Sequence, residues 1–174
     1  EAERAAGLIS LYEGGQALTS IDLKRASEGI QKRAALAQMI RAEDLTAAQT
    51  AAERFKSNLR EAVDTCQGDA VITPTWPFAA PLISAETVPV NGREVPVDPH
   101  RSCFVRAGNA VDACAITLPI GIYPHERVPA GVQLMAPGGR ELRLLATALS
   151  VEAALPPPPR APVLAAYLSS PASR

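Results

Sequence analysis

The first 73 residues contain no proline, whereas all 16 prolines lie at position 74 or later. Proline breaks helices and removes a backbone donor from sheets, so its absence favours uninterrupted helix in the first part of the chain. The sequence also lacks an internal repeat, which excludes a solenoid. The 174 residues therefore predict one domain with a helical beginning and a mixed continuation, divided near residue 68.

The chain has no surplus of basic charge and no long apolar run. It carries 17 basic and 18 acidic residues, and its lysines all lie within the first 56 positions. No stretch is long enough to span a bilayer, and the opening sequence Glu1-Ala2-Glu3-Arg4 has none of the features of a signal peptide. We therefore expect no nucleic-acid partner, no membrane partner and a cytoplasmic location.

Familiar catalytic and cofactor motifs are missing as well. The sequence contains no nucleophile elbow, P-loop, dinucleotide-binding glycine motif or His-Glu-x-x-His motif. Its three cysteines, Cys66, Cys103 and Cys114, cannot all pair and show no metal-ligand spacing. We therefore predict neither a disulfide scaffold nor a metal site, and no cofactor.

Apolar periodicity predicts four helices, with a proline-rich tail from 156 to 174. The expected helices cover residues 1–13, 21–40, 46–67 and 140–155, and a short helix is expected at 163–168 in the tail. Gly14-Gly15 is expected to end the first helix, Ser20 to cap the second, and Thr46 to open the third with a capping box that Gln49 completes.

Short β-branched runs predict the strands. They cover residues 70–73, 113–118 and 131–135, each before a proline, and their composition is typical of strands buried on both faces. Asn91-Gly92 within residues 88–97 predicts a separate, exposed hairpin. Together with the helices, this order indicates an α/β layer structure.

The loop after the first predicted strand carries Thr75, Trp76 and Phe78. Ligand crevices of open α/β sheets gather at such strand ends, so the three residues are candidates for a substrate pocket, or they simply cover the sheet end. His100 and Cys103 are weaker candidates, because nothing but Arg101 would lower the pKa of the thiol. His125 lies in a turn-like connection where an ordinary exposed imidazole is expected.

Three segments in order resemble amidase signature enzymes. Gly68-Asp-Ala-Val-Ile-Thr-Pro-Thr75, with Ala80-Pro81 behind it, resembles the strand and loop that open the last third of that family. The segments 109–121 and 128–134 follow at a suitable distance. Asp112, Cys114 and Ile120 depart from the usual family residues, so the amide substrate stays open.

The resemblance implies a C-terminal portion of an amidase over residues 1–155, helical to 67 and sheet-containing from 68, with part of a mixed sheet between helical layers. It also implies a Ser-Ser-Lys triad, and this chain contains none of it: Ser84, Ser102 and Lys24 match no catalytic position. The expected partners are the N-terminal half of the same amidase, on the same or a separate chain, and a small amide substrate, with a homodimer as a further expectation. Ile120 joins Thr75, Trp76 and Phe78 as a predicted substrate-binding residue, and the chain alone is expected to be inactive.

Two other functions stay open at this point. A non-catalytic interaction subunit or binding module would fit the absent triad, the alanine-rich helices and the polyproline segment. An independent thiol hydrolase would need Cys103 and His100 in hydrogen-bonding contact together with an orienting acid. The spacing of these two residues makes that function the weakest of the three.

Overall fold

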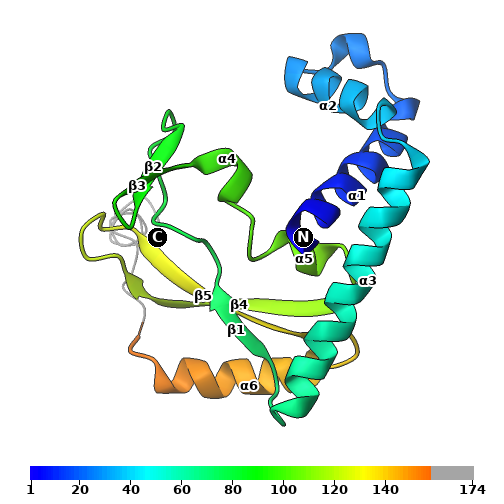
Figure 1. Ribbon diagram of the computed structural model, residues 1–174. Coiled ribbons are helices and arrows are strands. Elements are labelled where there is room, and N and C mark those ends of the chain that lie inside the picture. Colours follow the sequence, from blue (N-terminus) through cyan, green and yellow to red (C-terminus); the bar gives the residue numbers. More distant parts are fainter. Residues whose placement is uncertain (158–174) are drawn as a thin grey trace, which may run out of the picture.

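The computed structural model describes residues 1–157, so the helix expected at 163–168 and most of the proline-rich tail lie outside the described residues. The helices are α1 (Ala2–Ala17), α2 (Glu28–Gln38), α3 (Ala42–Thr65), α4 (Val97–His100), α5 (Arg106–Asn109) and α6 (Glu141–Ala154). The strands are β1 (Val71–Pro74), β2 (Thr87–Val90), β3 (Arg93–Pro96), β4 (Ala113–Ile122) and β5 (Pro129–Pro137). The predicted α/β class is confirmed, with helices first and a mixed region after them (Figure 1).

The main sheet has the strand order β1-β5-β4, and both pairings are antiparallel. Met135 at the centre pairs with Val71 on one side and with Ala115 on the other. The strands β2 and β3 form a separate ribbon, whose turn residues Asn91 and Gly92 have the left-handed backbone expected of a tight hairpin. All three predicted strands and the predicted hairpin are therefore confirmed, although β4 and β5 are longer than expected.

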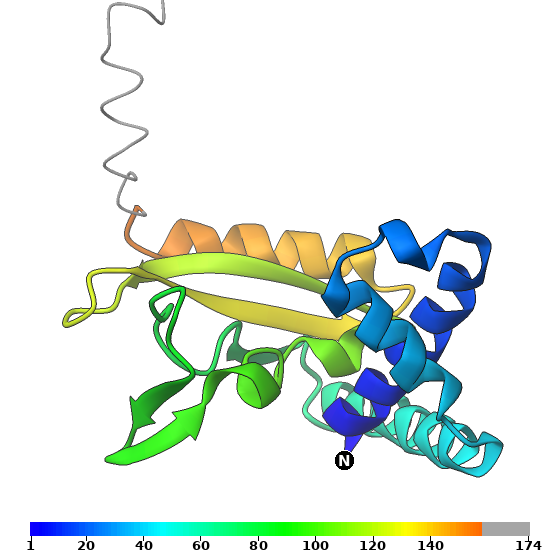
Figure 2. The same cartoon turned by 90° about the horizontal axis from the view of Figure 1, so that it is seen from above.

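Helices cover the two faces of the sheet. In Figure 2, α6 lies along one face of β4 and β5, while α4, α5 and the hairpin lie on the other side. Leu144 and Ala148 of α6 pack against a buried set on the sheet that consists of Leu118, Leu134 and Ala136. On the opposite face, Leu59 and Val63 of α3 pack against Met135.

Strand burial differs from the prediction. Only the second half of β5, from Gln133 to Pro137, is buried throughout, whereas β1 alternates between half-buried and exposed residues. Ile72 of β1 keeps 60% of its surface exposed. The expectation of strands buried on both faces is therefore wrong for β1 and β4. The composition of a strand does not tell which other elements pack against it.

An ion pair ties the start of β1 to α6. Asp69 accepts hydrogen bonds from Arg143 and, at 3.0 Å, from the Thr147 hydroxyl. These two hydrogen bonds, first that from Arg143, lower the pKa of the Asp69 carboxyl. The contact joins residues far apart in the sequence and so orients α6 along the sheet.

The first helix does not end at Gly14-Gly15, as the sequence predicted, but continues to Ala17. A Cβ atom at Gly15 would lie 2.2 Å from Cβ of Ala37 in α2, so the glycine allows close contact between two helices. Nothing lies within 4 Å of a Cβ at Gly14. The glycine at position 15 therefore serves tertiary packing and not helix termination.

The single helix predicted for residues 21–40 is also wrong in its first part. A 3₁₀ turn at Leu23–Arg25 takes the place of that part, after another 3₁₀ turn at Leu18–Ser20, and α2 begins only after Ser27. The Asp22 carboxylate accepts a hydrogen bond from the Lys24 N–H at 3.1 Å, which holds the second turn. Ser20 caps nothing there, since its hydroxyl donates back to the Ala17 carbonyl.

The third helix begins four residues before the predicted Thr46, whose hydroxyl donates to the Ala42 carbonyl at 2.9 Å instead of forming a capping box. Its end is a Schellman motif: Gln67 has φ 49, and the Gly68 N–H donates to the Val63 carbonyl at 3.0 Å. The last helix, α6, agrees with the prediction. Within residues 1–157, no helix is both long and apolar enough to cross a membrane.

Candidate functional site

The loop that leaves β1 is held against the end of β4 and β5. The Thr75 N–H donates to the Gly131 carbonyl at 3.1 Å, which extends the β1–β5 pairing by one residue. The Thr75 hydroxyl donates to the Thr117 hydroxyl of β4 at 3.3 Å, across the intervening strand. These two contacts fix the point at which the chain turns away from the sheet.

Two aromatic rings follow directly. Trp76 and Phe78 meet edge to face, with their ring centroids 6.2 Å apart and their planes at 84°. Phe78 is only 8% exposed, whereas Trp76 keeps 38% of its surface open. The buried ring therefore supports the one that solvent or a ligand reaches.

A hollow of about 390 Å³ lies in front of these residues, and we call it the aromatic groove. It is lined by Thr75, Trp76, Phe78, Ala80, Thr117, Pro119, Tyr123, Pro129, Ala130 and Gly131, none of which is charged. Three of the four residues predicted from the sequence thus share one hollow. That they bind substrate stays a prediction.

The fourth predicted residue, Ile120, does not line the aromatic groove. It is the extra residue of a bulge in β4, where the register with β5 shifts between Pro119 and Gly121. Sequence reasoning missed Thr117, Tyr123 and Gly131, which come from the facing ends of β4 and β5. The glycine two residues after Pro119 is a local signal for a bulge in β4, but it does not tell which side chains face the groove.

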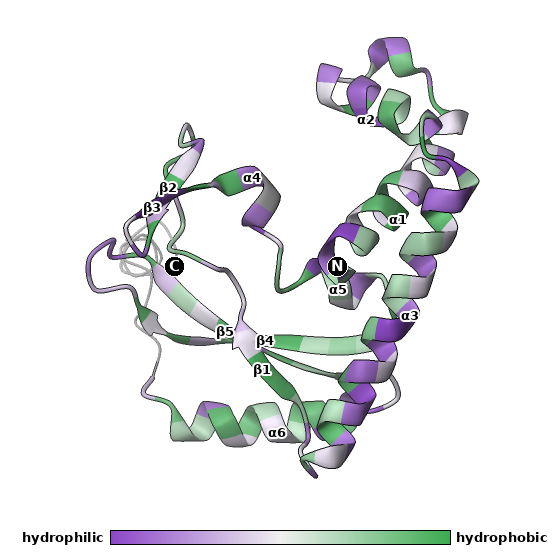
Figure 3. Ribbon diagram, in the orientation of Figure 1, coloured by the Kyte–Doolittle hydropathy of each residue, from purple (hydrophilic) through white to green (hydrophobic). Residues whose placement is uncertain are grey.

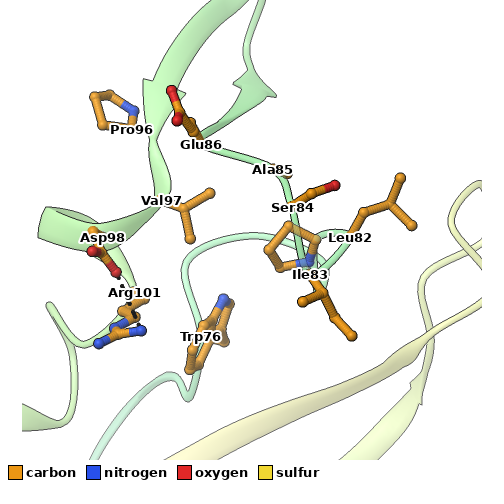
Figure 4. Close-up of a pocket in the computed structure, with 11 residues that line it drawn as sticks. Trp76, Leu82, Ile83, Ser84, Ala85, Glu86, Pro96, Val97, Asp98 and Arg101 are labelled. Atoms are coloured by element: carbon orange, nitrogen blue, oxygen red, sulfur yellow. Dashed lines mark ion pairs between the residues drawn. The ribbon is translucent and has the colours of Figure 1, made fainter. Parts of the chain in front are cut away.

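A second hollow of about 570 Å³, which we call the hairpin cavity, shares Trp76 with the aromatic groove. Its walls come from the segment Pro81–Glu86 and from the start of α4. Figure 4 shows Trp76 and Val97 on opposite sides of this cavity, with the ion pair between Asp98 and Arg101 beside them. Arg101 lies 3.2 Å from the Asp98 carboxylate. This cavity is therefore charged where the aromatic groove is not.

A buried amide anchors the chain between α4 and α5. Gln133 of β5 is only 4% exposed, and its side-chain N–H groups reach the Phe104 carbonyl at 3.0 Å and the Thr73 hydroxyl at 3.5 Å. The partners of this amide explain why a polar side chain is tolerated at the centre of the sheet. The loop that carries Cys103 is thereby held on the inner face of the sheet.

The surroundings of Cys103 do not suit a thiolate nucleophile. Burial, with the Glu3 charge as a second cause, raises the pKa of the Cys103 thiol. His100 uses Nδ1 to donate to the Pro96 carbonyl at 2.9 Å. His125 lies exposed in the turn between β4 and β5. Among residues 1–157 no group of three histidine, cysteine or acidic side chains is placed to hold a metal ion.

Comparison with solved structures identifies the fold as that of amidase signature proteins. The chain is similar to an amidase crystal structure with a TM-score of 0.69 at 20% identity, covering 84% of this chain and 33% of that one. It is similar to 6-aminohexanoate cyclic dimer hydrolase with a TM-score of 0.63 at 22% identity, covering 86% and 33%. At these identities the likeness concerns the fold alone.

The sequence itself matches the Amidase family over residues 16–145, and the chain belongs to that family. It is 29% identical over 156 residues to a fatty acid amide hydrolase of Medicago truncatula, covering 86% of this chain and 25% of the relative. It is 35% identical over 86 residues to 2-amino-5-chloromuconic acid deaminase of Comamonas testosteroni, covering 49% and 18%. The chain thus spans a quarter or less of the length of these relatives.

Proposed function

We propose that this chain is the C-terminal portion of an amidase that hydrolyses a carboxamide C–N bond and releases ammonia or an amine. The observation that carries the proposal is the family match across residues 16–145, which includes the loop and strand ends that form the aromatic groove. In this proposal Thr75, Trp76 and Phe78 form a wall of the substrate pocket. Ile120 takes a secondary place at the bulge beside it.

The chemistry is assigned to another part of the amidase, which carries the Ser-Ser-Lys triad. Amide hydrolysis needs an activated nucleophile and donors for the developing oxyanion. Ser84, Ser102 and Lys24 are not assigned to that triad, and the Cys103 thiol has a raised pKa. The chain alone is therefore expected to be inactive and to contribute sheet strands and pocket wall.

The surface on which we place the remainder of the amidase domain is the outer side of α6. Leu142, Leu145 and Leu149 lie there at helical spacing and are exposed, while the other side of α6 packs on the sheet. Figure 3 shows the hydrophobic colouring that α6 shares with β1 and β4. A helix that is apolar on both sides is typical of one enclosed by two layers. The amidase of the solved structure is about three times as long as the region that matches this chain. The occupant that we propose for the outer side of α6 is the corresponding unmatched part of the amidase domain.

The same proposal includes a cytoplasmic location, a small amide as substrate, and no cofactor, nucleic acid or membrane as a partner. Free thiols at Cys66, Cys103 and Cys114 suit a reducing compartment. The balanced charge of 17 basic and 18 acidic residues gives no attraction to polyanions. A homodimer through α6 would be an alternative use of the same leucines.

The first experiment is the intact mass of the purified material under denaturing conditions, combined with an assay of ammonia release from simple amides. We expect a second, larger polypeptide in active preparations. A lone 18.3 kDa species that is a stable, inactive monomer would contradict the proposal and favour a binding module.

A variant tests the docking surface. Leu145→Asp places a charge on the outer side of α6 and is expected to abolish co-purification of the second polypeptide, because the charge would be buried without a partner. Met39→Asp, at an exposed apolar position outside the sheet region, serves as the control. Retention of the partner by Leu145→Asp would exclude α6 as the interface, and a mass of twice the chain under native conditions would indicate the homodimer.

A further inference from the structure

We infer that the aromatic groove binds an uncharged aromatic group, so that the favoured substrates are amides with a planar apolar substituent. This inference rests on the proposed amidase function and adds the substrate class to it. It is argued from the lining of the groove, from the pair of rings at its side and from the threonines at its floor.

The lining determines which charge the groove accepts. Its ten residues include Trp76, Phe78, Tyr123 and two prolines, but no acidic or basic side chain. A charged group that enters such a site loses hydration and finds no counter-charge in return. The volume of about 390 Å³ is in the range of small-molecule sites and leaves room for a ring together with an amide. An uncharged, largely apolar group therefore fits best.

The ring pair favours aromatic over aliphatic groups. Phe78 is buried and holds Trp76 at an interplanar angle of 84°, so the indole has a fixed orientation. Because 38% of Trp76 stays accessible, the indole offers a rigid aromatic surface at little cost in side-chain entropy. A second ring gains edge or stacking contacts there that an alkyl chain does not.

The floor of the groove supplies a polar anchor. The hydroxyls of Thr75 and Thr117 lie 3.3 Å apart and share one hydrogen bond, which leaves the proton of the Thr117 hydroxyl for a ligand amide. Gly131 lies beside them, and a Cβ atom there would come within 3.1 Å of the Thr117 methyl and 3.4 Å of the Thr75 hydroxyl. The missing side chain keeps the two threonines accessible.

The hairpin cavity gives an internal contrast. It shares Trp76 with the aromatic groove and is lined by Glu86, Asp98 and Arg101 as well. With two carboxylates and one guanidinium in its lining, that cavity favours a cationic ligand, so an anion such as phenylacetate fits neither hollow. Trp76 thus lines both a charged and an uncharged hollow, and its fluorescence reports on both.

Trp76 is the only tryptophan of the chain, so its emission measures binding without any requirement for catalysis. The purified protein, with whatever polypeptide accompanies it, is titrated with phenylacetamide, with propanamide and with phenylacetate. The Trp76→Phe preparation serves as the blank. We expect phenylacetamide to saturate at a concentration at least about tenfold lower than propanamide, because the ring buries additional apolar area. Phenylacetate should give no saturable change.

Two variants locate the signal. Gly131→Ala should weaken phenylacetamide binding about fivefold, because its methyl group narrows the floor. Gly14→Ala is the matched control, since nothing lies within 4 Å of its Cβ atom. Thr117→Val keeps the shape of the side chain and removes the hydroxyl, and it should weaken phenylacetamide binding without loss of fold.

Equal saturation by propanamide and phenylacetamide, or binding of phenylacetate as tight as that of the amide, would overturn the inference. Unchanged binding in both Gly131→Ala and Thr117→Val would overturn it too. Ammonia release from propanamide without phenylacetamide binding would overturn the substrate class and leave the amidase proposal standing. Phenylacetamide binding by the protein together with its second polypeptide, without hydrolysis of any amide, would overturn the amidase proposal and leave the binding preference of the groove standing.

Discussion

The helical region, α1 to α3, and the sheet region, β1 to α6, solve the packing problem with different side chains. The buried cluster between α1 and α3 consists of three alanines and Ile9, whereas the cluster between the sheet and α6 contains Leu118, Leu134 and Leu144. Alanine removes little apolar surface from water, so the helices gain stability by close approach. An added methyl group is therefore expected to reduce the stability of the helical region, and a truncated side chain to reduce that of the sheet region.

The largest effect is expected from Leu134→Ala in the sheet region. Leu134 is 4% exposed and contacts both β4 and α6, so its truncation leaves a cavity between sheet and helix. We expect the free energy of unfolding to fall by about 3 kcal/mol, measured by urea denaturation. Ile83→Ala, at a fully exposed position, is the control and should stay within about 0.5 kcal/mol of the parent. A loss below that limit for Leu134→Ala would remove the contrast between the regions.

The next effect concerns an added methyl group in the helical region. Gly15→Ala should lower the free energy of unfolding by about 2 kcal/mol, because its Cβ would overlap that of Ala37. Gly14→Ala has open space and should gain about 1 kcal/mol from helix propensity.

The double variant Gly15→Ala with Ala37→Gly moves the methyl group to the facing helix and should recover most of the loss. Thermal unfolding of the parent, of Gly15→Ala, of Ala37→Gly and of the double variant gives the coupling between the two positions. If Gly15→Ala stabilised the chain as much as Gly14→Ala, close packing of α1 on α2 would be excluded.

A smaller effect separates the ion pairs of the two regions. Hydrogen bonds from Arg143 and Thr147 lower the pKa of Asp69, so its stabilising contribution is present above the ordinary carboxyl pKa of about 3.9 and is lost as the pH falls through the lowered value. Asp69→Asn should therefore reduce stability at pH 7 and flatten the loss in acid, as followed by urea midpoints across pH.

Asp44 provides the counterpart within a single helix. A hydrogen bond from Arg41 lowers the pKa of Asp44 as well, but the two residues are only three positions apart and join no separate elements. Asp44→Asn should change the urea midpoint less than Asp69→Asn at pH 7. Equal shifts would show that the long-range position of Asp69 adds nothing.

The smallest expected effect is that of Cys103→Ala on amide hydrolysis. Cys103 faces an apolar hollow with Phe55, Leu59 and Met135, and burial raises the pKa of its thiol. The rate of ammonia release by the complete enzyme should stay unchanged. Loss of activity with unaltered stability would reinstate the thiol hydrolase.

The sequence predicted the sheet region better than the helical one, for a physical reason. The strands β1, β4 and β5 are announced locally, by β-branched runs that end before a proline, and Asn91-Gly92 dictates its own turn. The role of Gly15 cannot be predicted from neighbouring residues, because it depends on Ala37 in another helix. Ser20 has the residue type of a helix cap, but α2 begins after Ser27 instead. Small residues leave helix boundaries to tertiary contacts.

The same division runs through the candidate site. Thr75, Trp76 and Phe78 could be predicted together, since one loop carries all three. Tyr123 and Gly131 could not, because they reach the groove only through the bulge in β4 and the register of β5. Ile120 is the extra residue of this bulge and is not among the residues that line the groove.

The central place of β5 in the sheet imposes an order on biosynthesis. Gln133 meets Thr73 across 60 residues, so β1 leaves the ribosome long before its neighbour exists. The helices α1 to α3 precede both strands and can associate as soon as they are synthesised. Until β5 is synthesised, β1 has an unpaired edge and Ile72 stays exposed. Closing that long loop is the slow step of contact formation. A nascent chain paused before residue 129 would contain the helices α1 to α3 but would lack β5, so β1 and β4 would have no strand between them and would be prone to aggregate.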